Sequence, residues 1–443
     1  MLGTRASFIA RRALCVMLIA AGASVVSCAA AAPSTPAPSA PTPPIASVAT
    51  TPTESAASAS RVTPTREARP GTPSGAFTLT VWMAEEIAPG TTPAGRILRN
   101  QLDAFSAANS GIRIEIVPKK SSGKGGLLDF LTSTRAVVPA RLPDLIALDL
   151  SDVPLAADAG FTQPLDGLLA AESSADLVPF AAQAARYQNQ WVALPFAANV
   201  EHLVYNKATV RQVPKTWDDF TKQKATLLLP LGGDSAFLLQ YLALGATLTD
   251  AANKTAIDSN AAAQTFAFFK RARDLGLLPD SALNLKTADD AWPAFAAGQV
   301  AMAQISAARF MTERAKAPNA VYASMPTREG KSAALATGWA FVVITSDATR
   351  QQAAARFMQW ITVGERLAPW LRATHLLPAS RASIVLAVEP ADYANFLRDQ
   401  LEHATSLPPT SSYTRQADAW RSAIAAVWKG QLTPEEAARN AAK

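Results

Sequence analysis

The chain has 443 residues, 49% of them hydrophobic, which suffices for roughly two or three domains with their own cores. Its formal net charge of +6 is unevenly spread, because residues 1–75 hold six Arg and two Glu, a net +4, and leave about +2 for the rest. That remainder is too nearly neutral for a basic stripe that binds phosphates, and we expect no nucleic-acid partner.

The first 28 residues are typical of an export signal. Arg5, Arg11 and Arg12 precede the apolar run ALCVMLIAAGASVV, which is too short for a comfortable membrane span. The run ends in VVSC, similar to the bacterial lipobox, so Cys28 is expected to carry lipid as the first residue of the mature protein. The alternative is a plain signal peptide with a chance cysteine. Cys15 lies in the discarded part, so the mature chain would have no disulfide.

Residues 29–75 consist mainly of Ala, Pro, Ser and Thr, with almost no large apolar side chain. Such a segment cannot bury enough surface to offset the entropy of ordering. We expect a disordered, partly extended tether between the lipid anchor and the folded part, which begins at FTLTVW.

From that point strand-like and helix-like segments alternate. The pattern predicts strands at 77–82, 112–117 and 144–149, and helices at AGRILRNQLDAFSAAN, GLLDFLTST and DLVPFAAQAARY. Strands separated by helices are typical of an α/β fold with a largely parallel sheet covered on both faces.

The middle of the chain is mostly helical. PKTWDDF has a capping-box pattern, and FLLQYLALGATL and AAQTFAFFKRARDLG follow it. The last of these places Phe266, Phe269 and Leu275 on one face and ends at Gly276. DDAWPAFAAGQVAMAQIS then runs from helix into strand, AFVVIT is a further strand, and helices continue to the end.

No catalytic motif is present. His202, His375 and His403 are far apart and lack metal-ligand spacing. SSGKGGLL lacks both the upstream glycine of a phosphate loop and the Ser or Thr after Lys124, and no G-x-S-x-G occurs. We therefore expect no metal and no cofactor, and a protein that binds a solute without transforming it.

The stretch WVALPFAANVEHLVYNK, residues 191–207, reads as two short apolar strands interrupted by a polar break. The break is either an ordinary loop or a place where the chain crosses between two compact units with its polar groups exposed.

A family resemblance decides between these interpretations. TLTVW, LPDLIALD, WVALPFAANVEHLVYNK, VPKTWDDF, AWPAFAAGQVAM, TGWAFVVI, LLPASR and GQLTPEEA follow one another in this order. The order resembles the extracellular solute-binding proteins of sugar-importing ABC transporters, the family that includes maltodextrin-binding proteins, and it covers residues 77–443.

The resemblance implies a class II periplasmic-binding-protein fold, in which two α/β lobes close about a hinge on a ligand in the cleft. The N-terminal lobe is then 76–199 with 330–380 and the C-terminal lobe 200–329 with 381–443, with crossings near 197–200, 325–336 and 377–383. It also implies a monomer, lipid-anchored outside the cytoplasm in the periplasm or at the cell surface, that delivers a sugar or related small solute to ABC permease subunits.

Cleft residues are expected where strands end, since ligands of open α/β sheets bind there. Trp82 ends the first strand and precedes Glu85 and Glu86, a ring and carboxylates that suit a sugar. Asp149 ends the third strand, and Asn199 matches a position from which the family's crossing segment faces the ligand. The structural alternatives are a core tryptophan at Trp82, a helix cap at Asp149 and a turn residue at Asn199.

In the C-terminal lobe, Asp234 and Phe237 follow Gly232-Gly233 at the start of a helix, where they either meet the ligand or serve as cap and core. Trp339 matches a family position that faces the cleft, with burial near the hinge as its alternative. We expect five other tryptophans to pack in the interior: Trp191, Trp217, Trp292, Trp420 and Trp428.

One departure bears on the ligand. Where many relatives carry a Gly-rich turn with a stacking aromatic, this chain has Ala307-Ala308-Arg309-Phe310. Either Phe310 replaces the aromatic, or Arg309 binds an anionic group on an acidic solute.

Two other functions compete with import. The first is an orphan sensor or scaffold that kept the fold and lost transport. The second is an exported glycoside hydrolase that uses Glu85, Glu86 and Asp149 as acid and base.

Overall fold

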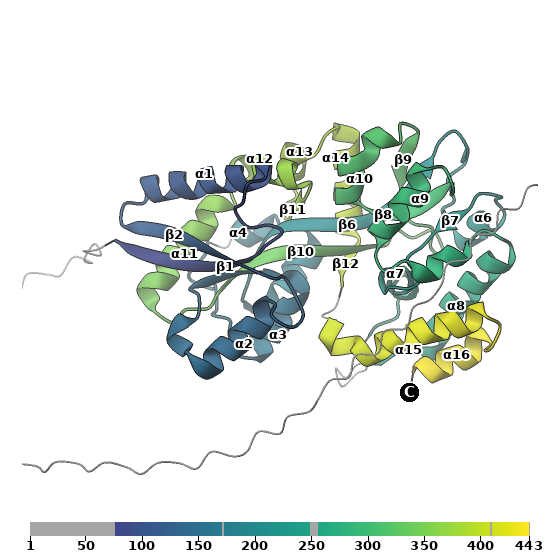
Figure 1. The fold of residues 1–443 in the computed structure, drawn as a ribbon, viewed down its shortest axis with the longest axis horizontal. Helices are drawn as coiled ribbons and strands as arrows, with labels where there is room; N and C mark the ends of the chain where they lie inside the picture. Colours follow the sequence, from purple (N-terminus) through teal and green to yellow (C-terminus); the bar gives the residue numbers. More distant parts are fainter. Residues whose placement is uncertain (1–75, 171, 249–255, 408–409, 443) are drawn as a thin grey trace, which may run out of the picture. The chain divides into compact units, whose positions relative to one another are not determined.

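The computed structural model describes residues 76–170, 172–248, 256–407 and 410–442, drawn in colour in Figure 1. The predicted signal peptide, Cys28 and the tether to residue 75 lie outside the described residues. No helix of the described part is both long and apolar enough to cross a membrane.

The described residues form twelve strands and sixteen α-helices. The strands are β1 (Phe77–Ala84), β2 (Ile112–Lys119), β3 (Leu145–Asp149), β4 (Arg186–Tyr187), β5 (Gln190–Trp191), β6 (Leu194–Asn206), β7 (Leu227–Leu228), β8 (Met302–Ser306), β9 (Ala320–Ala323), β10 (Ala334–Val343), β11 (Leu377–Pro378) and β12 (Ala404–Ser406). The helices are α1 (Pro93–Ala108), α2 (Leu127–Val137), α3 (Val153–Asp158), α4 (Glu172–Ala175), α5 (Pro179–Ala184), α6 (Trp217–Thr221), α7 (Ser235–Ala243), α8 (Ser259–Asp274), α9 (Trp292–Ala296), α10 (Ala307–Glu313), α11 (Ala348–Ile361), α12 (Gly364–Thr374), α13 (Ile384–Ala387), α14 (Ala391–Glu402), α15 (Thr410–Trp428) and α16 (Pro434–Ala441). Two 3-10 turns also matter for the site, η2 (Leu150–Asp152) and η4 (Ala288–Ala291).

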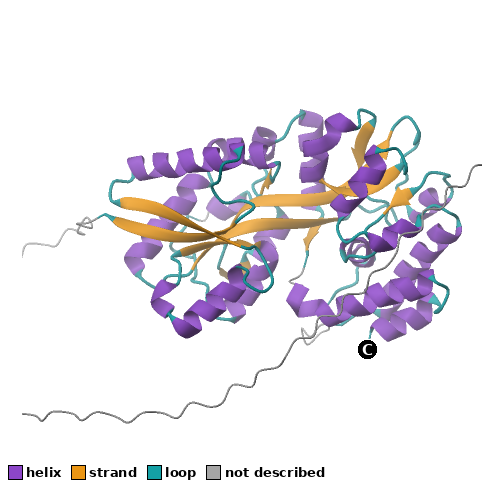
Figure 2. Ribbon diagram, in the orientation of Figure 1, coloured by secondary structure: helices purple, strands orange, loops and turns teal. Residues whose placement is uncertain are grey.

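The central sheet has the strand order β2-β1-β3-β10-β6-β8-β7, with β9 and β11 paired to β6 and β12 paired to β10. Helices lie on both sides of it (Figure 2), as the predicted α/β class requires. The expectation of a largely parallel sheet was wrong. β1 is parallel to β2 and β3, but β10 runs antiparallel to β3 and β6, and β6 runs antiparallel to β8. Local helix–strand alternation does not reveal these pairings, because β6 and β10 meet partners far away in the sequence.

The predicted interruption within residues 191–207 was also wrong, because β6 continues through it as one strand. Its first part pairs with β10 and β11, where Ala198 faces Gly338 and Leu377. From Glu201 onward it pairs with β8, beginning with Ser306. The polar residues thus mark the place where the strand changes partners. We call the sheet on the β1 side of this place the N-terminal half and that on the β8 side the C-terminal half; the lobe boundaries given above stay a prediction.

Aromatic side chains build much of the hydrophobic core in both halves. In the N-terminal half, Phe105 of α1 meets Phe357 and Trp360 of α11 edge-on, with ring centroids 5.2 and 5.6 Å apart. In the C-terminal half, Trp217 stacks on Phe268 with centroids 4.5 Å apart. The other tryptophans expected to pack are buried, with exposed fractions of 6% or less: Trp191, Trp292, Trp420 and Trp428.

The helix that was expected to bury Leu275 ends before it. Phe266 and Phe269 are buried on α8 as predicted, but Leu275 is 52% exposed. Leu275 is the C-cap and still has helical dihedrals, but it follows Phe266 by nine residues, two and a half turns, so it lies on the opposite side of the helix before Gly276, with φ of 72°, ends it.

Candidate functional site

A cavity of about 790 Å³ opens beside the end of β3. Its wall comes from the loop before α2, from α2 itself, from the end of β3 with η2 and α3, from β10 and from α15. The lining residues are Ser121, Ser122, Gly123, Leu128, Asp129, Thr132, Asp149, Ser151, Asp152, Leu155, Trp339 and Thr414. One large aromatic ring therefore shares this space with three carboxyl groups and several hydroxyl groups.

Sheet pairing fixes the position of Trp339. Trp339 and Asp149 are register partners across the antiparallel pair β10–β3, and the ladder to β6 shifts register between Trp339 and Ala340. The preceding residue, Gly338, has room only for a hydrogen, because a Cβ there would lie 2.5 Å from the carbonyl oxygen of Ala197. Trp339 is partly exposed, so part of its ring remains available at the cavity.

Asp149 and Asp152 are carboxyl groups with raised pKa values. Asp149 Oδ1 accepts a hydrogen bond from the Ser151 backbone N–H at 2.8 Å. Burial raises the pKa of Asp149, and the hydrogen bonds from Ser151 oppose the rise. Burial, followed by the nearby charge of Asp149, raises the pKa of Asp152 to about 6. Asp149 therefore serves both as the cap of η2 and as a wall of the cavity, which the sequence had presented as alternatives.

The loop SSGKGG forms another part of the wall. Gly123 and Gly125 have φ of 72° and 76°, which favours glycine at both positions. Asp129 closes the loop by accepting from the Gly125 N–H at 2.8 Å, and Ser121 Oγ donates to Glu86 Oε1 at 2.5 Å. Glu86 thus reaches the rim through Ser121.

Of the other two residues expected beside this site, Glu85 is exposed and Trp82 is buried. Trp82 is only 6% exposed and meets Phe130 edge-on with ring centroids 6.3 Å apart. The ammonium group of Lys119 lies 5.2 Å from its ring centre. Trp82 packs between strand and helix here, with little free surface, and Glu85 is not among the residues that line the cavity.

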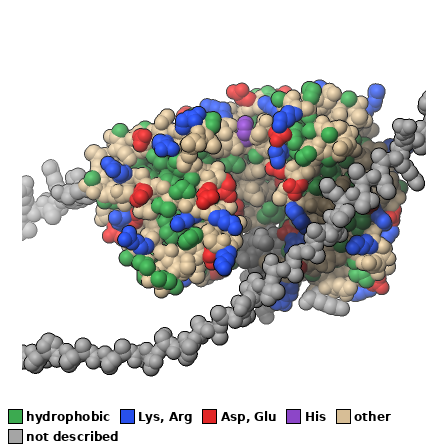
Figure 3. Space-filling view, in the orientation of Figure 1, with side chains coloured by type: hydrophobic (Ala, Val, Ile, Leu, Met, Phe, Trp, Pro, Cys, Tyr) green, Lys and Arg blue, Asp and Glu red, His purple; other side chains and the backbone are tan. Residues whose placement is uncertain are grey.

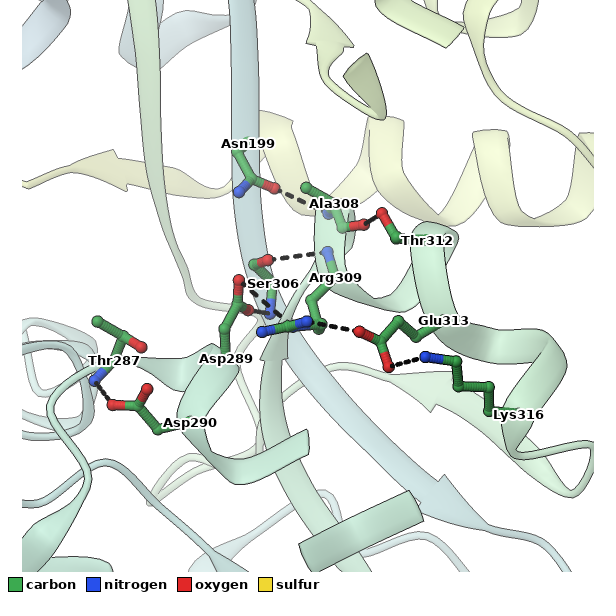
Figure 4. Close-up of polar contacts among 10 residues, drawn as sticks. All are labelled: Asn199, Thr287, Asp289, Asp290, Ser306, Ala308, Arg309, Thr312, Glu313 and Lys316. Carbon is green, nitrogen blue, oxygen red and sulfur yellow. Dashed lines mark hydrogen bonds and ion pairs between the residues drawn. The ribbon is translucent and has the colours of Figure 1, made fainter. Parts of the chain in front are cut away.

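Asn199, which still pairs with β10 just before β6 changes partners, and Arg309 of α10 belong to a second polar group, at the start of α10 (Figure 4). Asn199 Oδ1 accepts from the Ala308 N–H at 3.1 Å, which joins the crossing strand to the helix. Arg309 Nη1 lies 2.6 Å from Glu313 Oε1, and its Nε lies 4.0 Å from Asp289 Oδ2. Two carboxylates therefore already face Arg309, an arrangement that does not favour binding an anionic group of a solute as a third.

Phe310, offered as a replacement for the stacking aromatic, is 3% exposed. Its ring packs among those of His202, Trp292, Tyr322 and Tyr393. That interpretation was wrong, because the side chain points from the start of α10 into the core, where other rings surround it.

The structure gives Phe237 the core role that was its alternative, whereas the side chain of Asp234 does not cap α7. Asp234 Oδ1 accepts from Trp420 Nε1 at 3.2 Å and forms an ion pair with Arg421, so it joins α7 to α15. Phe237 is 0% exposed and stacks on Trp420 with centroids 5.0 Å apart. We correct the expectation of a ligand contact for Phe237, because a fully buried ring has no face for a solute.

Sequence reasoning thus found two residues of the cavity, Asp149 and Trp339, and missed most of its polar lining. Ser151 and Asp152 follow the end of β3 directly, so the rule that placed Asp149 could have included them. Asp129 and Thr132 lie in the first two turns of α2, and no sequence pattern marked them as lining a cavity.

Comparison with known proteins now identifies the family. A model of the bacterial extracellular solute-binding proteins matches residues 100–398. The chain belongs to this family. Its members bind solutes outside the cytoplasm and are not enzymes, so the glycoside-hydrolase hypothesis is set aside.

Individual relatives are more distant. The maltotriose-binding protein of Pyrococcus abyssi is 32% identical over 92 residues, and this match spans 20% of either chain. Among solved structures, the cyclic alpha-maltosyl-1,6-maltose binding protein from Arthrobacter globiformis has a TM-score of 0.67 at 21% identity, over 83% of this chain and 97% of that one. The sugar-binding protein MalE from Xanthomonas citri has a TM-score of 0.69 at 18% identity, over 82% and 95%. These structural matches establish the predicted periplasmic-binding-protein fold.

Proposed function

We propose that this solute-binding protein captures a sugar or short oligosaccharide outside the cell and delivers it to an ABC importer. The observation that carries the proposal is the cavity where the Trp339 ring lies beside the carboxyl groups of Asp129, Asp149 and Asp152. A sugar presents an apolar face that stacks on an aromatic ring and a rim of hydroxyl groups that hydrogen-bond to carboxylates. Relatives that bind maltotriose or cyclic alpha-maltosyl-1,6-maltose agree with this chemistry.

Charge also favours a neutral solute. Among the described residues, the cavity is lined by three acidic side chains and by no Lys or Arg. Figure 3 shows acidic and basic side chains interspersed over the visible face of the described part, without a large basic patch. An acidic sugar would meet repulsion at these carboxylates, so a neutral one is the better fit.

The direct test is a calorimetric titration of the mature protein with maltose, maltotriose, maltotetraose and, for contrast, glucuronic acid. We expect saturable one-to-one binding of at least one neutral sugar and none of the acid. Absence of any binding across the panel would overturn the sugar proposal and favour the orphan-sensor hypothesis.

Membrane attachment through Cys28 is a separate part of the proposal. The lipid on this cysteine would be the only apolar anchor, because the tether has almost no large apolar residue. Cys28→Ser should release the protein from the membrane fraction and leave sugar binding unchanged. Retention of this variant on membranes would refute the lipoprotein assignment.

Delivery requires permease subunits as partners, which the protein would meet as a monomer. Vesicles that contain the candidate permease should take up labelled maltotriose only when this protein is added. Uptake that does not depend on the protein would separate it from transport.

A further inference from the structure

Glu201 is the first residue of β6 to pair in the C-terminal half of the sheet, and sequence reasoning gave it no role. Its register partner is Ser306, the last residue of β8 and the side chain that caps α10. β7 and β8 are parallel, so Glu201 lies at the edge where the carboxyl ends of these strands give way to α7 and α10. Ligands of α/β sheets bind at such edges.

Glu201 and Asn199 point to the same side of β6, since side chains alternate along a strand. Asn199 is held at the start of α10, and Glu201 is held by its neighbours on β8 and α7. Gln304 Nε2 donates to Glu201 Oε2 at 2.6 Å, and Ser235, the first residue of α7, also donates to this carboxyl group. Glu201 as a residue is nevertheless not fully buried, so a solute can reach it while Gln304 and Ser235 orient its carboxyl group.

Gln304 supplies the second observation. Its side chain is 0% exposed, and its carboxamide oxygen Oε1 has no hydrogen-bond partner among the described residues. An unsatisfied buried acceptor is costly. Oε1 of Gln304 belongs to the same carboxamide group as Nε2, the nitrogen that contacts Glu201. If Glu201 is a carboxylic acid, its O–H can donate either to Oε1 of Gln304 or to a ligand. A carboxylate has no such hydrogen.

We propose that Glu201 is a ligand-binding residue of the C-terminal half of the cleft and that it binds in its protonated form, as a carboxylic acid oriented by Gln304. This inference rests on the proposed function, because it assumes a hydroxyl-bearing solute between the two halves. A carboxylic acid can donate to one sugar hydroxyl and accept from another, whereas a carboxylate can only accept.

The electrostatic surroundings agree with a protonated group. Burial, and to a smaller extent the charge of Asp289, raises the pKa of Glu201 to about 7, and the hydrogen bonds from Gln304 and Ser235 oppose the rise. On the side of Glu201, the other charged groups are Asp289 on η4, Asp234 before α7, and Arg309 and Glu313 on α10. On the opposite face of β6, His202 lies against Tyr393 of α14. The two nearby cations are already paired, Arg309 with Glu313 and Arg421 with Asp234, so neither compensates a charge on Glu201. The strands β8, β9, β10 and β11 bring no charged side chain.

The test is maltotriose titration between pH 6 and pH 8 for the wild type and for Glu201→Gln, which mimics the acid in shape and keeps a hydrogen-bond donor. If only the acid binds, wild-type affinity should fall about tenfold between pH 6 and pH 8, in proportion to the protonated fraction. Glu201→Gln should bind as tightly as the wild type does at pH 6 and lose this fall. Glu115→Gln, the same change at an exposed position on β2, should keep the wild-type pH dependence.

The outcomes separate this inference from the function on which it rests. If neither protein binds any sugar of the panel at any pH, the proposed function fails and the inference falls with it. If the wild type binds maltotriose but Glu201→Gln shows the same affinity and pH dependence, or loses binding at pH 6, the inference alone is overturned. Thermal melts without sugar verify that Glu201→Gln is folded, and it should be more stable than the wild type at pH 8 but equal to it near pH 4, below the ordinary pKa of 4.5.

Discussion

Trp339 and Asp149 face each other across the antiparallel pair β10–β3, and both side chains line the same cavity. Neighbouring strands lie about 5 Å apart. The sheet itself therefore sets the separation between a stacking surface and a hydrogen-bond acceptor, and no mobile loop is needed to bring the two together.

This pairing predicts the effect of removing the ring. Trp339→Ala should weaken sugar binding by roughly 1–3 kcal/mol, the scale of a lost aromatic contact, and should change stability much less because the ring is partly exposed. Calorimetry and thermal melts measure the two effects. The matched control is Trp428→Ala: Trp428 is 4% exposed and donates to Asp280, so we expect the protein to lose about 3–5 kcal/mol of stability without selective loss of affinity. Unchanged affinity in Trp339→Ala would place the ligand elsewhere.

The residue before Trp339 provides a finer test. In Gly338→Ala, the new Cβ would lie 2.5 Å from the Ala197 oxygen and 2.7 Å from Leu150 Cδ1, so β10 must shift at the register change beside Trp339. We expect roughly 1–3 kcal/mol of destabilisation from overpacking, together with weaker sugar binding. Gly90→Ala is the control, since a Cβ there has nothing within 4 Å. Equal melting temperatures for the two variants would contradict this explanation.

Local features of the fold could be predicted from the sequence because they depend on neighbouring residues. The capping box of Thr216 and Asp219 forms as expected, with the Asp219 N–H donating to Thr216 Oγ1 at 3.0 Å. The antiparallel insertion of β10 between β3 and β6 could not be predicted in this way, because it depends on pairing with strands far away in the sequence. The family resemblance assigned residues 330–380 to the N-terminal lobe but did not predict this antiparallel pairing.

The site residues divide in the same way, into those that a local pattern or the resemblance marked and those whose role depends on distant neighbours. Asp149 was found because it ends a buried strand, and Trp339 because the resemblance marked it. Phe237 was assigned to the ligand because it follows a glycine pair, but Trp420 of α15 covers its ring. Glu201 escaped notice because an acidic residue within an apolar strand was read as part of a polar break. A single sequence does not show which face of a ring or strand is covered.

Asp152 should make stability depend on pH. Its pKa is raised to about 6 in the folded protein, above the ordinary value of 3.8, so the folded state favours the protonated acid. The resulting stability is present below about pH 4 and is lost as pH rises through 6. Asp152→Asn removes the titration, so we expect it to be about 1–2 kcal/mol more stable than the wild type at pH 8 and equal to it at pH 4, after allowance for partial solvent exposure. Melting temperatures at the two pH values measure this, and a constant difference would refute the assignment.

His202 should act in the opposite sense. It is 0% exposed, with Nδ1 3.0 Å from the Leu203 oxygen and Nε2 2.8 Å from the Tyr393 hydroxyl. Nδ1–H must donate to the carbonyl, so the neutral ring accepts the tyrosine hydrogen at Nε2. Burial lowers the pKa of His202 to about 4, and the hydrogen bond to Leu203 opposes the change.

The folded state therefore favours neutral His202, while the unfolded chain takes up a proton near its ordinary pKa of 6.5. Stability is fully present above pH 6.5 and falls as pH drops toward 4, by up to about 3 kcal/mol from this group. His202→Phe should be less stable than the wild type at pH 7, because the Tyr393 hydroxyl and the Leu203 carbonyl lose their partner. The same variant should lose less stability than the wild type between pH 7 and pH 4.5, because it has no imidazole to titrate.

Urea unfolding followed by tryptophan fluorescence at both pH values gives the free energy of unfolding of the wild type and of the variant. Tyr393→Phe keeps the imidazole and is the control: it should be destabilised at pH 7 yet retain the fall in stability toward acid pH, and an equal fall in all three proteins would show that His202 is not its source.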